Sequence, residues 1–204
     1  VAAVALGAPH RAVSFAVPTG NFGDIFAGYV ARRMGLPIER LIIASNANDI
    51  LPRTLHQGAY EMRDAVPTSS PSMDIQISSN FERYLFGASG RDAAMIRGFM
   101  GSLTQSRRFE LGRLAGAMQN DFTAQAASEP DVANAIRHVA TASGYVMDPH
   151  TACGWVAAQK GKVRKDTIGA PVVVLATAHP AKFEGIPSFK EQGIDVELGN
   201  WRGV

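Results

Sequence analysis

Apolar runs separated by polar and glycine-rich stretches divide the chain into short strands and amphipathic helices. Continuous apolar runs predict buried strands at residues 11–17 (RAVSFAV), 41–45 (LIIAS) and 171–176 (PVVVLA). Residues 73–78 (MDIQIS) alternate between apolar and polar side chains and predict a further strand. Residues 25–35 have helical spacing, with arginines in the last turn and a glycine after it; the apolar side of this helix is expected to carry Ile25, Phe26, Tyr29, Val30 and Met34.

Helical patterns dominate the rest of the chain. We expect helices at residues 48–57, 80–86, 131–142 and 150–160, and a helix-rich insertion at residues 91–118. Ser128 followed by Asp131 has the spacing of a capping box and predicts a helix start. A strand, a turn, a helix and a second strand in this order are typical of a parallel sheet, so the predicted fold class is α/β with a helical insertion.

Composition narrows the possible partners. The chain has 204 residues with 20 Lys and Arg against 18 Asp and Glu, so its net charge of +2 indicates neither nucleic acid nor an anionic membrane as a partner. Apolar residues make up 46% of the chain, as expected for a protein with a buried core, and no apolar run approaches the roughly 18 residues of a membrane span. The only cysteine, Cys153, excludes an internal disulfide and a cysteine-based metal cluster, and no metal site is predicted. This cysteine usage fits a reducing compartment, and we expect a cytoplasmic protein with Cys153 packed inside it.

The two ends of the chain have no terminus signals. Residues 1–6 are apolar without a helix cap and without the basic region of a signal peptide, and the chain stops after WRGV. We therefore expect the chain to be a fragment with missing upstream sequence.

A glycine-rich turn joins the first predicted strand to the first predicted helix. In such a turn, backbone N–H groups approach an anion and the helix N-terminus adds about half a positive charge, which makes Gly20, Asn21, Phe22, Gly23 and Asp24 a candidate phosphate loop. The G-x-x-G spacing matches neither G-x-G-x-x-G nor the Walker pattern, so a simple tight turn is equally compatible with it. A dinucleotide site would need an acidic residue closing the second strand, for which Asp49 is only a loose candidate.

Five strings carry a resemblance to a known family. The string VPTGNFGDIFAGYVARRMGLP, followed by IASNANDILPR, SSNFERYLF, DPHTA and ATAHPAKF, resembles threonine synthase, a pyridoxal-phosphate enzyme, in its bacterial and fungal branch. The strings keep the family's order and spacing over residues 2–183. The resemblance implies a fold-type II architecture, in which the cofactor lies between two α/β domains. It also implies conversion of O-phospho-L-homoserine and water to L-threonine and phosphate.

The resemblance assigns roles to individual residues. It implies that the loop of Gly20 to Asp24 surrounds the phosphate of pyridoxal 5′-phosphate and that the hydroxyl of Thr177 binds the pyridine nitrogen. A neutral hydroxyl there leaves the nitrogen less protonated than an aspartate would. His150, His179 and Asn80 lie in the matching strings and are second-tier candidates, although a lone histidine or a helix cap explains them as well.

The family's cofactor lysine has no match in this chain. It precedes the phosphate loop in a Ser-Phe-Lys-Asp-like motif that is absent before Gly20, whereas the SFK string ending at Lys190 follows Thr177. We therefore predict no catalytic residue here and an inactive chain, with the N-terminal part of the enzyme as a missing partner. Residues 1–183 form the predicted partial enzyme domain. Residues 184–204 form an unrelated or divergent tail, in which residues 185–204 resemble a segment of the solute-binding proteins of tripartite tricarboxylate transporters.

Two other interpretations remain open at this point. The chain is also compatible with another fold-type II enzyme, such as a dehydratase, although the string TAHPAKF argues against it. The alternative from a different class is a non-catalytic or chimeric fragment that retains only a phosphate-binding loop.

Overall fold

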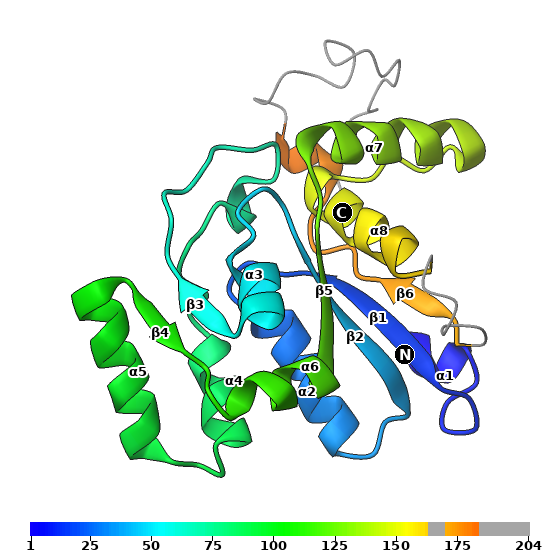
Figure 1. The fold of residues 1–204 in the computed structure, drawn as a ribbon. Helices are drawn as coiled ribbons and strands as arrows, with labels where there is room; N and C mark the ends of the chain where they lie inside the picture. Colours follow the sequence, from blue (N-terminus) through cyan, green and yellow to red (C-terminus); the bar gives the residue numbers. More distant parts are fainter. Residues whose placement is uncertain (163–169, 184–204) are drawn as a thin grey trace.

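A computed structural model describes residues 1–162 and 170–183. Its centre is a four-stranded parallel sheet with the order β5-β2-β1-β6 (Figure 1). The strands are β1 (Val13–Pro18), β2 (Ile38–Ser45), β5 (Phe122–Ala126) and β6 (Val172–Val174). The chain enters the sheet in its middle and winds outward in both directions, which is the arrangement expected when helices connect parallel strands.

Helices cover both faces of this sheet. On one face, Leu41 and Ile43 of β2 pack in a core cluster with Ile25 of α2 (Gly23–Arg33). On the other face, Ile42 and Ala44 pack against Ala157 and Ala158 of α8 (Pro149–Lys162). Burial on both faces explains why β2 is a continuous apolar run in the sequence.

The helix α8 lies unusually close to the sheet. A Cβ atom placed on Gly154 would lie 2.9 Å from Cγ1 of Val174 and 3.3 Å from the ring of Pro18. Any larger residue at this position would therefore push α8 away from the ends of β1 and β6.

An antiparallel strand pair and the helix that precedes its second strand lie beside the main sheet, at the left of Figure 1. An antiparallel pair, β3 (Ala59–Glu61) and β4 (Arg108–Glu110), packs with α5 (Ala93–Ser106), which has no fully buried residue. Rings of Tyr60, Phe81 and Phe109 stack here with centroids 5.0–5.4 Å apart. The other helices are α1 (Ala2–Ala5), α3 (Ile50–Gln57), α4 (Phe81–Ala88), α6 (Leu114–Asp121), α7 (Glu129–Ser143) and the 3-10 turns η1 (Pro71–Met73) and η2 (Pro180–Phe183).

Most predicted elements are confirmed. The strands at 11–17 and 41–45 and the helices at 25–35, 48–57, 80–86, 131–142 and 150–160 are present, with ends shifted by a few residues. The capping box of Ser128 and Asp131 is formed in both directions. The insertion at 91–118 contains α5 and α6, as expected, but β4 lies between them.

The strand predicted at residues 73–78 is wrong. The 3-10 turn η1 ends at Met73, and a loop follows it. Two side chains explain the error: Asp74 turns its carboxylate toward the loop of Thr68, and Ile77 is 52% exposed. Alternation in this segment therefore reflects local polar contacts rather than a sheet with one buried face.

Other predictions about the sheet need correction. The predicted strong strand at 171–176 is a three-residue edge strand whose residues are only half-buried, and Thr177 lies three residues beyond it. The strands β3, β4 and β5 were not predicted, because three-residue strands and the sequence FTAQA carry little β signal of their own. On α2, Ile25 and Tyr29 are buried as expected, but Val30 and Met34 are 38% and 82% exposed.

Within the described ranges, no helix has both the length and the apolar character required to cross a membrane. The predicted tail at 184–204, including Lys190, lies outside the described residues.

Candidate functional site

A pocket of about 330 Å³ opens at the carboxyl ends of β1 and β6, where ligands bind in open parallel sheets. Its walls come from four segments that are far apart in the chain. The lining residues are Pro18, Gly20, Asn21, Asp24, Ser72, Met73, His150, Thr177 and Ala178. The volume is within the range of small-molecule sites.

The glycine-rich loop presents unpaired donors to this pocket. In the described part of the chain, the N–H groups of residues 20–24 donate to no protein acceptor. The carbonyl groups of the same loop are occupied: the Ser78 hydroxyl donates to the oxygen of Gly20 at 2.7 Å, and Asn80 donates its N–H and its Nδ2 to the oxygen of Asn21 at 3.0 and 2.8 Å. An array of free N–H groups at the N-terminus of α2 has the donors to bind an anion, and a phosphate group fits this donor set.

The buried side chain of Phe22 fixes the backbone conformation of this loop. Its backbone has φ 65° and ψ 8°, a left-handed conformation that is strained for a bulky residue. Its side chain is 1% exposed and meets the rings of Phe81 and Phe122 edge to face at centroid distances of 5.2 and 5.5 Å. Burial of the ring therefore holds a backbone conformation that the residue would not adopt alone.

The opposite wall begins at the N-terminus of α8. Oδ1 of Asp148 accepts the backbone N–H groups of His150 and Thr151 at 2.8 and 3.3 Å, and the hydroxyl of Thr151 donates to Oδ2. The ring nitrogen Nδ1 of His150 lies 3.0 Å from Oδ1 of the same carboxylate. Burial opposes ionisation of Asp148, but the hydrogen bonds from His150 and Thr151 outweigh it and hold the pKa of Asp148 below its ordinary value.

His150 connects this wall to the loop after β3. Its Nε2 accepts the backbone N–H of Ser72 at 3.2 Å, while its Nδ1 faces the Asp148 carboxylate. An acceptor at Nδ1 and a donor at Nε2 assign the ring proton to Nδ1. His150 is 3% exposed and borders the pocket as a fixed, hydrogen-bonded group.

Ser72 and Met73 close the pocket between His150 and the phosphate loop. A Cβ atom on Gly20 would lie 3.0 Å from the carbonyl oxygen of Ser72 and 3.4 Å from Cα of Met73. Gly20 is thus required for the close approach of the loop to this wall. No sequence pattern identified Ser72 or Met73 as site residues, because the loop that contains them reaches the site only through tertiary contacts.

The structure brings together most of the predicted site residues. Four of them, Gly20, Asn21, Asp24 and Thr177, line the pocket with His150 from the second tier. The side chain of Phe22 is in the core, Gly23 contributes only backbone, and Asn80 braces the loop from outside the pocket. His179 is exposed and accepts the N–H of Ala181 at 3.2 Å, away from the pocket lining.

Two further predictions about reactive groups are resolved here. Cys153 is buried, as expected, and burial raises the pKa of its thiol to about 12. Asp49, the loose dinucleotide candidate, is bound to Arg53 at 2.8 Å one helical turn away and does not line the pocket.

Comparisons with known proteins agree with this geometry. A family model described as "Threonine synthase, C-terminal" matches residues 151–186. A threonine synthase of Pseudomonas aeruginosa is 44% identical over 183 residues, which cover 89% of this chain and 38% of the relative. The threonine synthase of Saccharomyces cerevisiae is 41% identical over 193 residues, which cover 87% of this chain and 37% of the relative.

Solved structures give the same result. A pyridoxal-phosphate-bound threonine synthase from Brucella melitensis superposes with a TM-score of 0.90 at 55% identity and covers 98% of this chain and 42% of that chain. The yeast enzyme superposes with a TM-score of 0.81 at 38% identity over 87% of this chain and 38% of that chain. The resemblance to threonine synthase and the fold-type II α/β class are therefore confirmed. The chain spans about two fifths of the length of these relatives.

Proposed function

We propose that this chain, similar to threonine synthases in sequence and fold, is the cofactor-binding part of such an enzyme, which forms L-threonine and phosphate from O-phospho-L-homoserine and water. The observation that carries this proposal is the array of free N–H groups at residues 20–24, which shares one pocket with the hydroxyl of Thr177. We propose pyridoxal 5′-phosphate as the cofactor and a cytoplasmic location.

The loop has the chemistry to hold the cofactor phosphate. Backbone donors at a helix N-terminus bind a phosphate dianion without a cationic side chain, because the peptide dipoles of α2 supply partial positive charge. Among the lining residues that the structure describes, Asp24 is the one with a negative charge, which opposes an anion. Its carboxylate lies in the first turn of α2, where it interacts favourably with the helix dipole. Ser72 and Met73 limit how far a bound group extends from the loop.

Thr177 would bind the ring end of the cofactor, and His150 would hold the pocket wall beside it. When bound, pyridoxal phosphate supplies an electron sink for charge that develops next to the substrate amino group. The Thr177 side chain makes no hydrogen bond within the described residues, so its hydroxyl is available to a pyridine nitrogen. His150 orients the wall rather than moving protons in this arrangement, because both ring nitrogens already have partners.

The proposal includes a limit on activity. The lysine expected upstream of the phosphate loop has no match among residues 1–19. We therefore expect the 204-residue chain by itself to bind the cofactor without turnover. Turnover would require a chain joined to upstream residues that supply this lysine.

Cofactor binding to the chain tests the proposal directly. We expect titration calorimetry to detect pyridoxal 5′-phosphate binding to the wild-type chain. Gly23→Asp should weaken it about tenfold or more, because a carboxylate at the N-terminus of α2 would repel the phosphate and offset the helix dipole that attracts it. A side chain fits there, since the nearest atom to a Cβ on Gly23 is Nδ2 of Asn80 at 3.7 Å. Gly23→Asn is the neutral control of the same shape and should bind nearly as well as wild type.

Three outcomes separate the alternatives. No binding of the cofactor to the wild-type chain would refute the proposal. Equal affinities of the Asp and Asn variants would refute the phosphate-loop assignment. Binding of inorganic phosphate as tightly as the cofactor would favour a simple anion-binding loop, because the pocket residues around Thr177 would then add nothing.

A further inference from the structure

A partly buried hydrogen-bond cluster surrounds the carboxylate of Asp74, a residue that was not a candidate site residue in the sequence. Oδ1 accepts Nδ2 of Asn46 at 2.8 Å, Nδ2 of Asn48 at 3.0 Å and the hydroxyl of Thr68 at 2.6 Å. Oδ2 accepts the backbone N–H of Thr68 at 2.8 Å. Both oxygens of one carboxylate therefore join residues from two loops.

The orientation of the two amides follows from backbone donors. Oδ1 of Asn46 accepts the N–H of Asn48 at 2.9 Å, and Oδ1 of Asn48 accepts the N–H of Val66 at 2.8 Å. Because each oxygen has its own backbone donor, both amide nitrogens must face Asp74. Asn46 and Asn48 are 0% and 3% exposed and Asp74 is half-buried, so these bonds are partly shielded from competing water.

This cluster lies directly behind the pocket wall. Asn46 and Asn48 follow the carboxyl end of β2, and Asp74 follows η1, whose Ser72 and Met73 line the pocket. The N–H of Ser72 binds Nε2 of His150, and its carbonyl lies against Gly20. The short turn η1 has no strand pairing, so these side-chain bonds, together with the buried side chain of Met73, hold its position.

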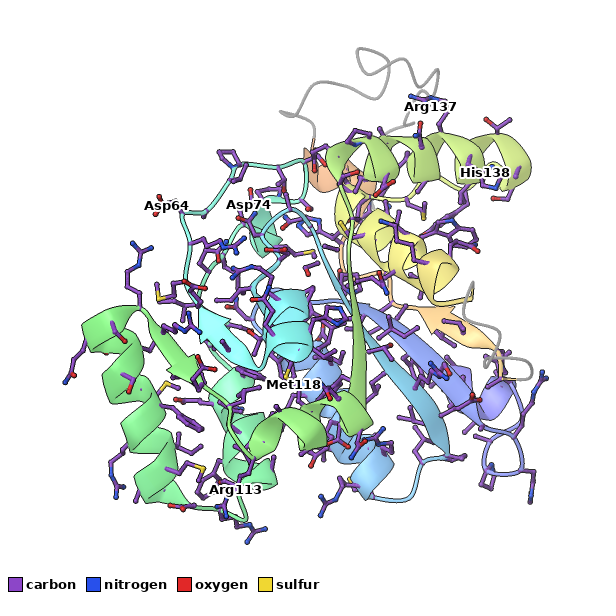
Figure 2. All side chains as sticks on the ribbon, in the orientation of Figure 1. Asp64, Asp74, Arg113, Met118, Arg137 and His138 are labelled. Atoms are coloured by element: carbon purple, nitrogen blue, oxygen red, sulfur yellow. The ribbon has the colours of Figure 1, made fainter. Side chains whose placement is uncertain are left out.

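A comparison with Asp64, a carboxylate in the same connection, shows that these hydrogen bonds are specific to Asp74. Figure 2 shows Asp64 on the outer side of the same connection, whereas Asp74 lies nearer the middle of the molecule. The side chain of Asp64 is 99% exposed and has only a 3.4 Å contact with Arg107. Removal of the negative charge should therefore disturb the hydrogen bonds behind the pocket wall at position 74 and leave them intact at position 64.

We propose that Asp74 is a positioning residue for the ligand pocket: its bonds to Asn46, Asn48 and Thr68 hold the wall of Ser72 and Met73 at the separation from Gly20 and His150 that the phosphorylated cofactor requires. This inference rests on the proposed function. It assigns control of cofactor affinity to a carboxylate that does not line the pocket.

The test compares Asp74→Asn with Asp64→Asn in the full chain. Asparagine at position 74 can still accept at one oxygen, but its amide would meet the N–H of Thr68, so two donors would face each other. Calorimetry gives the dissociation constant for pyridoxal 5′-phosphate. The ¹⁵N resonances of the His150 ring and the Ser72 amide report, without any ligand, whether the wall stays in contact with His150.

We expect Asp74→Asn to raise the dissociation constant about tenfold or more and to shift the Nε2 and Ser72 resonances. Asp64→Asn should change neither. A folded Asp74→Asn variant with wild-type affinity or unchanged resonances would overturn the inference. If that variant does not fold, Thr68→Val, which removes only the hydroxyl donor, should produce smaller shifts in the same direction, and their absence would overturn it equally.

A different measurement tests the proposed function. Absence of cofactor binding to the wild-type chain would refute that function, and the His150 and Ser72 resonances of Asp74→Asn would still decide whether Asp74 positions the wall.

Discussion

Phe22 offers a direct test of how the core shapes the phosphate loop. The residue combines a left-handed backbone, at φ 65°, with a side chain that is only 1% exposed. Two substitutions separate these features. Phe22→Ala removes the ring and keeps the strained backbone, whereas Phe22→Gly removes the ring and also the strain.

The structure sets the expected magnitudes. Truncation of a fully buried phenylalanine costs about 3–5 kcal/mol, and this ring also loses edge-to-face contacts with Phe81 and Phe122. A non-glycine residue in the left-handed region costs about 1–2 kcal/mol, which alanine still bears and glycine does not. Glycine in turn loses about 0.4–1 kcal/mol through the entropy of the unfolded chain. We expect Phe22→Gly to equal Phe22→Ala in stability or to exceed it by up to about 1.6 kcal/mol.

Urea unfolding of the two variants and of wild type measures these differences. Phe86→Ala is the matched control, because the same residue type on α4 is 38% exposed and should lose no more than about 1 kcal/mol.

Two results would refute the reasoning. A loss below about 1 kcal/mol in Phe22→Ala would show that the ring does not anchor the loop. A glycine variant clearly less stable than the alanine variant would show that residue 22 does not adopt the left-handed conformation in the folded chain, because glycine is the less stable choice at ordinary backbone angles.

Three other expectations follow from the same structure. Gly154→Ala should lower the free energy of unfolding by about 1–3 kcal/mol because its Cβ would lie 2.9 Å from Val174, whereas Gly98→Ala, with no neighbour within 4 Å, should raise it by up to about 1 kcal/mol; thermal unfolding of both variants gives the two signs. Because the folded pKa of Asp148 lies below its ordinary value of 3.8, its ionised form contributes stability above that pH and loses it as the pH falls through the folded pKa. The difference in unfolding free energy between wild type and Asp148→Asn should therefore shrink below about pH 4, and a difference that stays constant in acid would contradict this. Cys153, with a thiol pKa of about 12, should resist iodoacetamide at pH 8 until the chain is unfolded, as mass spectrometry can establish; rapid labelling of the folded chain would contradict its burial.

The sequence alone predicted the elements whose signals are local. The strands β1 and β2 contain continuous apolar runs, α2 has helical spacing that ends before a glycine, and the glycine-rich turn between β1 and α2 is the candidate phosphate loop. Each of these depends on residues within one short window, so periodicity and turn composition are sufficient. The resemblance to threonine synthase placed Thr177 and His150 at the same site, and the structure brings both to one pocket.

Only the tertiary structure decided how the pocket is enclosed. The bond between Ser72 and His150 joins residues 78 positions apart, and Asp74 meets Asn46 across 28 positions. The pattern around Asp74 instead predicted a strand, and β5, which forms one edge of the sheet, escaped prediction because its two alanines and its glutamine leave it without a continuous run of β-branched or aromatic residues. Phe22 was predicted to bind cofactor as part of the loop, yet its side chain is in the core. Contacts between distant segments decide these features, and no local pattern of apolar and polar residues encodes such contacts.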